Sequence, residues 1–216
     1  MQILTHHAGL LGRAAMLTLT LAIGGGAAAA VVGLLVGLAR LSPVPLLRHL
    51  GAAYVELVRN TPLTIVFFLM VFVLPEMGVL LPSYPITAIT ALGCYTAAFV
   101  AEAIRAGVRT VGRGQAEAAR ALGLSFLGSM RYVLVPQALR AVVPPLASIW
   151  IALVKNTSVA AGFGVLELTA ASQRINFLEP AAVIPVLLSV AAAYLVITLG
   201  SAALFRVLER RSVVVR

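Results

Sequence analysis

The sequence predicts an all-α integral membrane protein with five transmembrane helices, its N-terminus outside and its C-terminus in the cytoplasm. Of its 216 residues, 61% are hydrophobic and only 11% are charged, whereas a soluble domain carries about 25% charged residues. The mean hydropathy is +1.05, and a soluble domain of ~200 residues cannot hide that much apolar surface. The formal net charge of +9 is therefore interpreted as membrane orientation rather than nucleic-acid binding. Residues 1–216 are treated as a single transmembrane domain.

Five apolar runs are long enough to cross a bilayer, whose core of about 30 Å requires about 20 helical residues. The first run is too long for a signal peptide and lacks a cleavage site, so it is predicted to be an uncleaved span. Pro75 and Glu76 interrupt the second run. Pro82 and Pro85 precede the third and favour a helix start. The predicted spans are 14–39, 61–81, 86–103, 145–165 and 181–205.

Basic residues decide the orientation, because Lys and Arg concentrate in cytoplasmic loops. If the N-terminus lies outside, thirteen of the sixteen basic residues fall on the cytoplasmic side. Arg13 and Arg174 fall outside, and Lys155 lies within the fourth predicted span. The opposite orientation would leave thirteen positive charges outside, so we expect the C-terminus to be cytoplasmic.

The longest polar stretch, 106–144, predicts a helix, a tight corner and a second helix at the cytoplasmic surface. The residues before Gly123 favour helix, and Gly123 itself suits the left-handed conformation that ends one. Ser125 can cap the next helix, which Pro136 then stops or kinks. An ordinary surface helix is the alternative, because Glu117 also fits a routine i,i+3 pair with the arginine three residues later.

A polar run, Lys155, Asn156, Thr157 and Ser158, falls at membrane depth. Lys155 is ten residues after Pro145, which places it about 15 Å along a helix that begins there. A charge at that depth costs ~2.5 kcal/mol or more, so it requires a partner or a water-filled cavity. Two interpretations follow. Either the run lines a substrate pathway, together with Glu102, or Lys155 is structural: it extends toward the membrane surface, or braces the helices by pairing with Glu102 or a backbone carbonyl.

Smaller patterns indicate structure. Gly33 and Gly37 form a small-residue ridge for close helix packing. The stretch 46–58 is amphipathic and predicts an interfacial helix, in which Glu56 is expected to pair with Arg59.

The cytoplasmic stretch resembles the EAA loop of ABC importer permeases. The matching residues are Glu117, Ala118 and Ala119, then Gly123 six residues after the glutamate, then a Val-Leu-Val-Pro sequence that ends at Pro136. More specifically, the chain is similar to polar amino-acid permeases of the histidine, glutamine and arginine type. Further motifs in the family's order cover nearly the whole chain, at 54–63, 105–108, 114–115, 136–138, 144–145, 166–169 and 208–211.

The resemblance implies a multi-pass subunit of the bacterial cytoplasmic (inner) membrane. The EAA helix would dock on a cytosolic ATP-binding subunit. A second permease, identical or homologous, would complete the transmembrane part, and an extracytoplasmic solute-binding protein would deliver the solute. ATPase coupling would then rest on Glu117, Ala118, Ala119, Gly123 and Pro136. Two departures from the family pattern bear on the substrate: Phe99 stands in place of a tyrosine, and Asn156 in place of an aspartate.

The residues themselves predict neither an ATPase site nor another catalytic site. A P-loop needs Gly-Lys-Ser/Thr, but the sole lysine, Lys155, follows Val154. ATP and magnesium are therefore expected on a partner subunit, with no cofactor or metal on this chain. Three histidines and seven carboxylates are scattered too widely for an enzyme constellation. The alternative function is a self-sufficient secondary carrier or channel for a small solute, although no carbonyl-lined filter is evident.

Overall fold

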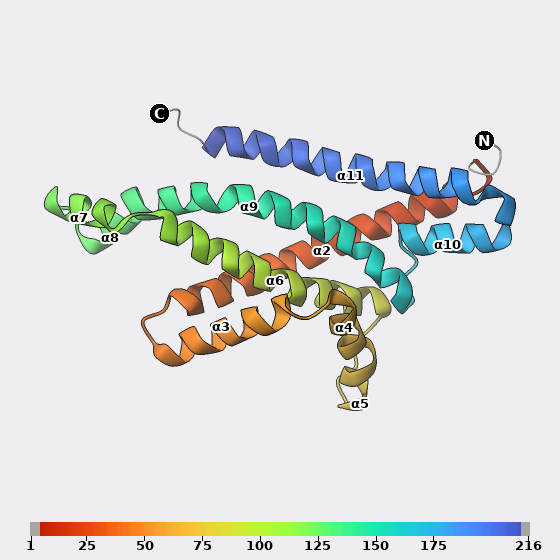
Figure 1. Ribbon diagram of the computed structural model, residues 1–216, viewed down its shortest axis with the longest axis horizontal. Coiled ribbons are helices and arrows are strands. Elements are labelled where there is room, and N and C mark those ends of the chain that lie inside the picture. Colours follow the sequence, from red (N-terminus) through yellow and green to blue (C-terminus); the bar gives the residue numbers. More distant parts are fainter. Residues whose placement is uncertain (1–4, 213–216) are drawn as a thin grey trace.

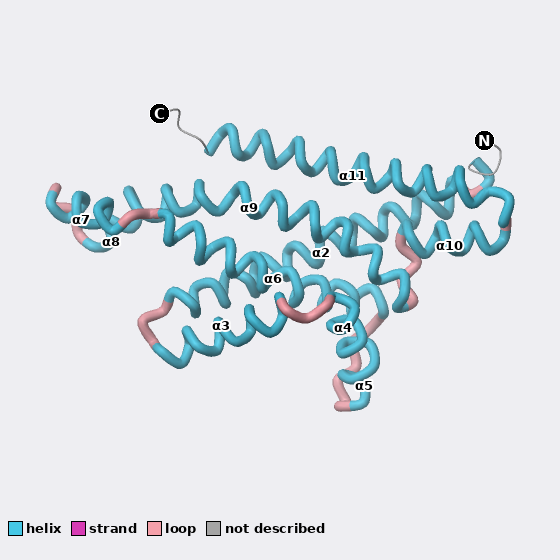
Figure 2. Tube along the Cα trace, viewed as in Figure 1, coloured by secondary structure: helices cyan, strands magenta, loops and turns pink. Residues whose placement is uncertain are grey.

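The computed structural model describes residues 5–212, and the elements in that range are all helical. Four helices are long and apolar enough to cross a membrane. They lie roughly along one long axis (Figure 1), and α2 and α11 both begin at the end of the molecule where α10 lies. The connections between helices are short (Figure 2). The long helices are α2 (Ala8–Leu41), α6 (Tyr84–Thr110), α9 (Val135–Asn156) and α11 (Val183–Ser212).

Close packing of α2 against α6 forms the centre of the bundle. A Cβ atom added to Gly33 would lie 2.6 Å from Cβ of Val100 and 2.9 Å from the carbonyl oxygen of Ala97. At Gly37 the added atom would lie 3.2 Å from Ile104. The small-residue ridge predicted on the first span is therefore confirmed as the surface that lets the two helices approach each other.

The second predicted span differs from the structure. In place of one helix over 61–81, there is a short arm of α4 (Leu63–Phe68), a π-helical segment (Leu69–Val73) and α5 (Leu74–Glu76). At 1.5 Å per residue the arm is only about 21 Å long, shorter than a bilayer core. It projects sideways from the bundle (Figure 1).

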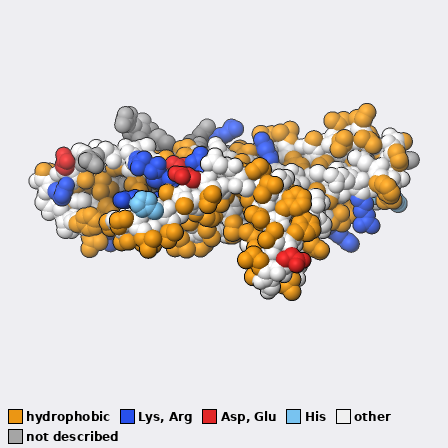
Figure 3. All heavy atoms as spheres, turned by 60° about the horizontal axis from the view of Figure 1, so that its bottom comes forward, with side chains coloured by type: hydrophobic (Ala, Val, Ile, Leu, Met, Phe, Trp, Pro, Cys, Tyr) orange, Lys and Arg blue, Asp and Glu red, His pale blue; other side chains and the backbone are white. Residues whose placement is uncertain are grey.

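The amphipathic stretch expected at the interface is α3 (Pro45–Arg59), and it packs against α2 and α6. The axis of α3 meets that of the α4–α5 arm at 106°, so the two form one broken span or a re-entrant segment. A space-filling view (Figure 3) shows that the projecting arm is mainly apolar, whereas basic side chains gather elsewhere on the same face. The four long helices and this bent pair account for up to five crossings.

The fourth predicted span begins earlier than expected. Pro144 and Pro145 lie inside α9 rather than at its start, and continuous helix runs from Phe126 to Phe163. The second helix predicted within the stretch 106–144 therefore continues into the fourth span without a break. A run of 38 residues is about 57 Å long, so part of it extends beyond a 30 Å bilayer core.

Two π-helical segments have the same cause in the sequence. Each ends two residues before a proline: Leu69–Val73 before Pro75, and η2 (Met130–Leu134) before Pro136. A proline ring clashes with the carbonyl four residues earlier in a regular α-helix. Widening to five-residue hydrogen bonds relieves that clash, so both prolines are accommodated without ending the helix.

A buried carboxyl group lies at the end of the bundle where α2 begins. Glu167 precedes α10 (Leu168–Leu178) and is fully buried. Its Oε1 accepts a hydrogen bond of 3.0 Å from the backbone N–H of Ala170, which caps α10. The N–H of Leu168 donates to the hydroxyl of Thr18 in α2 at 3.2 Å. Glu167 thus fixes the start of α10 beside α2.

Candidate functional sites: an exposed corner and a polar face

The predicted helix–corner–helix is built by α7 (Arg113–Ala121) and α8 (Phe126–Ser129). Gly123 has φ +82°, the left-handed conformation that glycine adopts without steric cost. The N–H of Leu124 donates to the carbonyl of Ala119 at 3.1 Å, and the N–H of Gly123 donates to that of Arg120 at 2.9 Å. These two bonds form a Schellman motif, which ends α7 and turns the chain sharply.

The next helix starts as the sequence indicates. The hydroxyl of Ser125 accepts a 3.1 Å hydrogen bond from the N–H of Gly128 and so caps α8. Pro136 is the second residue of α9, and the helix continues through it. The adjacent Gln137 donates from Nε2 to Oε1 of Gln115 at 3.3 Å, which ties α9 to α7. The cap on α8 and the hydrogen bond between α7 and α9 therefore both stabilise the corner.

Apolar side chains at this corner face solvent. Leu122 is 84% exposed, Phe126 73% and Leu127 78%. Glu117 and Ala118 are also exposed, whereas Ala119 is buried against the rest of the protein. Three large apolar side chains on one short corner form a surface that a partner protein could cover.

A second candidate site lies between α6 and α9. A cavity of 330 Å³ opens there, and its lining combines aromatic and polar side chains. Its lining residues are Tyr95, Thr96, Phe99, Ser148, Ile149, Ala152, Leu153 and Asn156.

The predicted polar run contributes one side chain to this cavity. Asn156 lines it, and Lys155 beside it is exposed. Thr157 is buried and donates to the carbonyl of Val154 at 2.7 Å, while Ser158 donates to that of Lys155 at 2.8 Å. Lys155 and Asn156 are therefore exposed to solvent or to the cavity, whereas Thr157 and Ser158 stabilise the end of α9.

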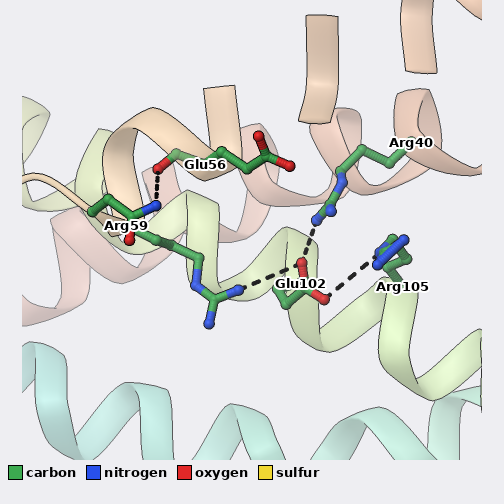
Figure 4. Close-up of polar contacts among 6 residues, drawn as sticks. Arg40, Glu56, Arg59, Glu102 and Arg105 are labelled. Carbon is green, nitrogen blue, oxygen red and sulfur yellow. Dashed lines mark hydrogen bonds and ion pairs between the residues drawn. The ribbon is translucent and has the colours of Figure 1, made fainter. Parts of the chain in front are cut away.

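Glu102 lies in a separate cluster with three arginines (Figure 4). Its Oε2 accepts a 2.5 Å hydrogen bond from Nη1 of Arg40. Arg59 and Arg105 each place a nitrogen 3.6 Å from one of its oxygens. Within the described residues, neither Lys155 nor Glu56 forms an ion pair. The predicted Lys155–Glu102 and Glu56–Arg59 pairs are therefore both wrong: arginines surround Glu102, and one of them is Arg59, which approaches Glu102 instead of Glu56.

The helix start from which the depth of Lys155 was counted needs correction. The expectation counted from Pro145 as a helix start, but Pro145 is inside α9. Lys155 is the last residue but one of α9, and a 3₁₀ segment, Thr157–Phe163, continues the helical run beyond it. It is thus about 15 Å from the end of that run.

Helices of membrane-spanning length, two cavities that share Phe99 and an exposed apolar corner are together typical of the transmembrane subunit of a transporter. The chain belongs to the family of binding-protein-dependent transport system inner membrane components, whose family model matches residues 13–214. Members of this family are the permease subunits of ABC importers in the bacterial inner membrane, and the ATPase is a separate subunit. This assignment replaces the alternative of a self-sufficient carrier or channel.

Individual relatives cover most of the chain. It is 38% identical over 181 residues to the probable glutamine ABC transporter permease protein GlnM of Bacillus subtilis (strain 168), covering 84% of this chain and 83% of the relative. It is 36% identical over 206 residues to the glutamine transport system permease protein GlnP of Escherichia coli (strain K12), covering 94% and 92%. A crystal structure of an amino acid ABC transporter with histidines matches with a TM-score of 0.88 and 30% identity over 96% of both chains.

The sequence did not indicate the partners of Glu102 or the burial of Glu167. Glu102 was expected in a substrate pathway or opposite Lys155, but Arg40 and Arg59 come from α2 and α3, and no local pattern joins them to it. Only the i,i+3 spacing of Glu102 and Arg105 could have indicated part of the cluster. The burial of Glu167 carried no signal either, apart from its place in a four-residue family motif.

Proposed function

We propose that this chain is the permease subunit of an ATP-driven importer for a polar amino acid, with its N-terminus outside and its C-terminus in the cytoplasm. The exposed apolar corner around Gly123 is the observation that carries the coupling role. It lies at the end of the molecule toward which α11 runs (Figure 1). Similarity to glutamine permeases supports the substrate class.

The corner would dock on the cytosolic ATP-binding subunit. Leu122, Phe126 and Leu127 supply apolar contact area, while Glu117 and Ala118 line the exposed side of α7. Ala119 and Gly123 keep the corner compact, and Pro136 begins the long helix behind it. ATP and magnesium bound by the partner would close the ATPase pair, and the movement would reach the bundle through α7 and α9.

The solute would pass along α6, which lines both cavities. Asn156 lines the cavity between α6 and α9, the exposed Lys155 is its neighbour in the chain, and Glu102 lines the second cavity. Thr157 and Ser158 stabilise the end of α9, which carries Lys155 and Asn156. A second permease subunit, identical or homologous, would enclose this face, and an extracytoplasmic solute-binding protein would supply the solute.

Reconstitution tests this proposal directly. The chain is co-expressed with its cognate ATP-binding and solute-binding proteins, and the purified complex is placed in proteoliposomes. Uptake of tritiated L-glutamine, L-glutamate, L-histidine and L-arginine is then measured with and without ATP. We expect ATP-dependent uptake of at least one of the four. Copurification without uptake of any polar amino acid would reject the substrate class and retain the coupling role.

A further inference from the structure

We infer that the cavity around Arg59 and Arg105 binds the carboxylate of the transported amino acid on its way through the permease. This inference rests on the proposed function and adds to it a specific binding group. The cavity has a volume of 420 Å³ and lies between α2, α3 and α6. Its lining residues are Arg40, Val55, Glu56, Arg59, Asn60, Phe99, Glu102 and Arg105.

The three arginines are not equivalent. Arg40 has a side chain only 7% exposed, and it makes the direct hydrogen bond to Glu102. The nitrogens of Arg59 and Arg105 stand 3.6 Å from the same carboxylate, beyond hydrogen-bond distance. Arg40 therefore holds Glu102 in place, and the donors of the other two arginines remain available to a further acceptor.

Two observations indicate that the missing acceptor is an anion. Nε of Arg105 is buried and has no hydrogen-bond partner, which costs free energy unless a ligand satisfies it. Three guanidinium groups line the cavity against two carboxylates, so one positive charge is left over. A carboxylate matches the planar fork of a guanidinium with two parallel hydrogen bonds.

Phe99 connects this cavity to the proposed pathway. Its side chain lines both this cavity and the one that contains Asn156. The guanidinium of Arg59 lies over its ring, 5.6 Å from the centroid. A solute that moves along α6 from one cavity to the other therefore passes Phe99 and meets Arg59 next. Because the carboxylate is common to all α-amino acids, this site would bind any of them and leave side-chain selection to other groups.

The test measures binding to the permease–ATPase complex in nanodiscs of phosphatidylcholine, without the solute-binding protein. The probe is the tritiated amino acid that the uptake assay identifies, and the competitor is its decarboxylated amine, which for L-glutamine is 4-aminobutanamide. We expect Arg59→Gln and Arg105→Gln each to weaken probe binding at least tenfold. Arg59→Lys and Arg105→Lys should recover part of that loss, and Arg48→Gln, on the exposed side of α3, should change nothing.

Four results would overturn the inference. The first is unchanged probe binding in both glutamine variants while wild-type uptake is intact, which leaves the proposed function standing. The second is a melting temperature lowered in both variants in proportion to the lost binding, which makes the arginines structural. The third is displacement of the probe when phosphatidylglycerol is added to the nanodiscs, which assigns the cavity to a lipid phosphate. Equal competition by the amine and the amino acid in wild type would also contradict it.

Discussion

The hydroxyl of Tyr194 in α11 donates a hydrogen bond to Oε2 of Glu167, with 2.6 Å between the two oxygens. Together with the bond from Ala170 to Oε1, this satisfies both oxygens of a fully buried carboxylate. Within the described residues Glu167 has no ion pair, so these hydrogen bonds are what compensate the burial of its carboxyl group. Tyr194 thereby fastens α11 to the rest of the bundle.

Replacing Tyr194 by phenylalanine should lower the melting temperature of the purified protein. The change leaves one oxygen of a buried carboxylate without its donor, which costs about 1–3 kcal/mol. Differential scanning fluorimetry in detergent measures the shift. Tyr84→Phe is the matched control, because Tyr84 is 60% exposed, and equal shifts in the two variants would contradict the assigned role of Tyr194.

Replacing Gly33 by leucine should destabilise the contact between α2 and α6. The new side chain would meet Val100 and the backbone of Ala97, and overpacking of this kind costs about 1–3 kcal/mol. Gly12→Leu, in the same helix, has nothing within 4 Å of the added Cβ and should melt like wild type. If Gly33→Leu also melts like wild type, the two helices are not packed as closely as described.

Gly123→Asp should abolish transport while the complex still inserts in the membrane. Aspartate brings a Cβ to a position with φ +82° and a carboxylate to an interface that is apolar on this side. Gly123→Asn is the informative partner variant, because asparagine tolerates the left-handed conformation and brings no charge. We expect it to retain far more uptake in proteoliposomes than the aspartate variant. Normal uptake with aspartate would remove the coupling role.

Lys155→Met should alter transport without altering stability. Lys155 is exposed and has no ion pair among the described residues, so its removal leaves no charge uncompensated. If it contacts the solute, the uptake rate should change by about tenfold, or ~1.4 kcal/mol of barrier. Parallel measurements of uptake and melting temperature on one preparation check this, and a lowered melting temperature with a proportionate loss of uptake would show a structural role.

Glu102→Gln should have the opposite profile in the melting assay. It removes the charge that compensates Arg40, whose side chain is 7% exposed. The cost should be about 2–3 kcal/mol, below the range for a fully buried pair, because the Glu102 side chain retains 29% exposure. A melting temperature equal to that of wild type would show that the arginine cluster does not brace the three helices.

Cysteine labelling in intact cells tests the orientation, after the native Cys94 has been replaced by alanine. Gln173 on α10 and Arg131 beside the corner are both exposed and stand on opposite sides of the proposed membrane. An impermeant maleimide should label Gln173→Cys and leave Arg131→Cys unlabelled until the cells are opened. The reverse pattern would place the C-terminus outside.

The sequence predicted those elements whose cause is local. Gly123 and Ser125 determine the corner through backbone conformation and a cap, both of which depend on neighbouring residues. Gly33 and Gly37 predicted the α2–α6 contact because small residues at helical spacing allow close approach wherever the partner lies.

Features that depend on contacts between residues far apart in the sequence were not predicted or were placed wrongly. Pro145 predicts a helix start because proline is favourable there, but α9 continues through it. Glu102 could not be matched with Arg40, since 62 residues separate them and only the packing of α2 on α6 brings them together. The helix in the second span is shorter than predicted, because hydropathy counts apolar residues and does not report the 106° turn between α3 and the arm.

The π-helical segment before Pro136 lies between the corner and the long helix that it would drive. In this segment the N–H of Val135 bonds to the carbonyl of Met130, five residues earlier, and the proline contributes no donor. Helices kink at prolines and π-bulges, so this joint has lower bending stiffness than the helix on either side. A push on the corner would then reach the bundle as a change of angle at Pro136.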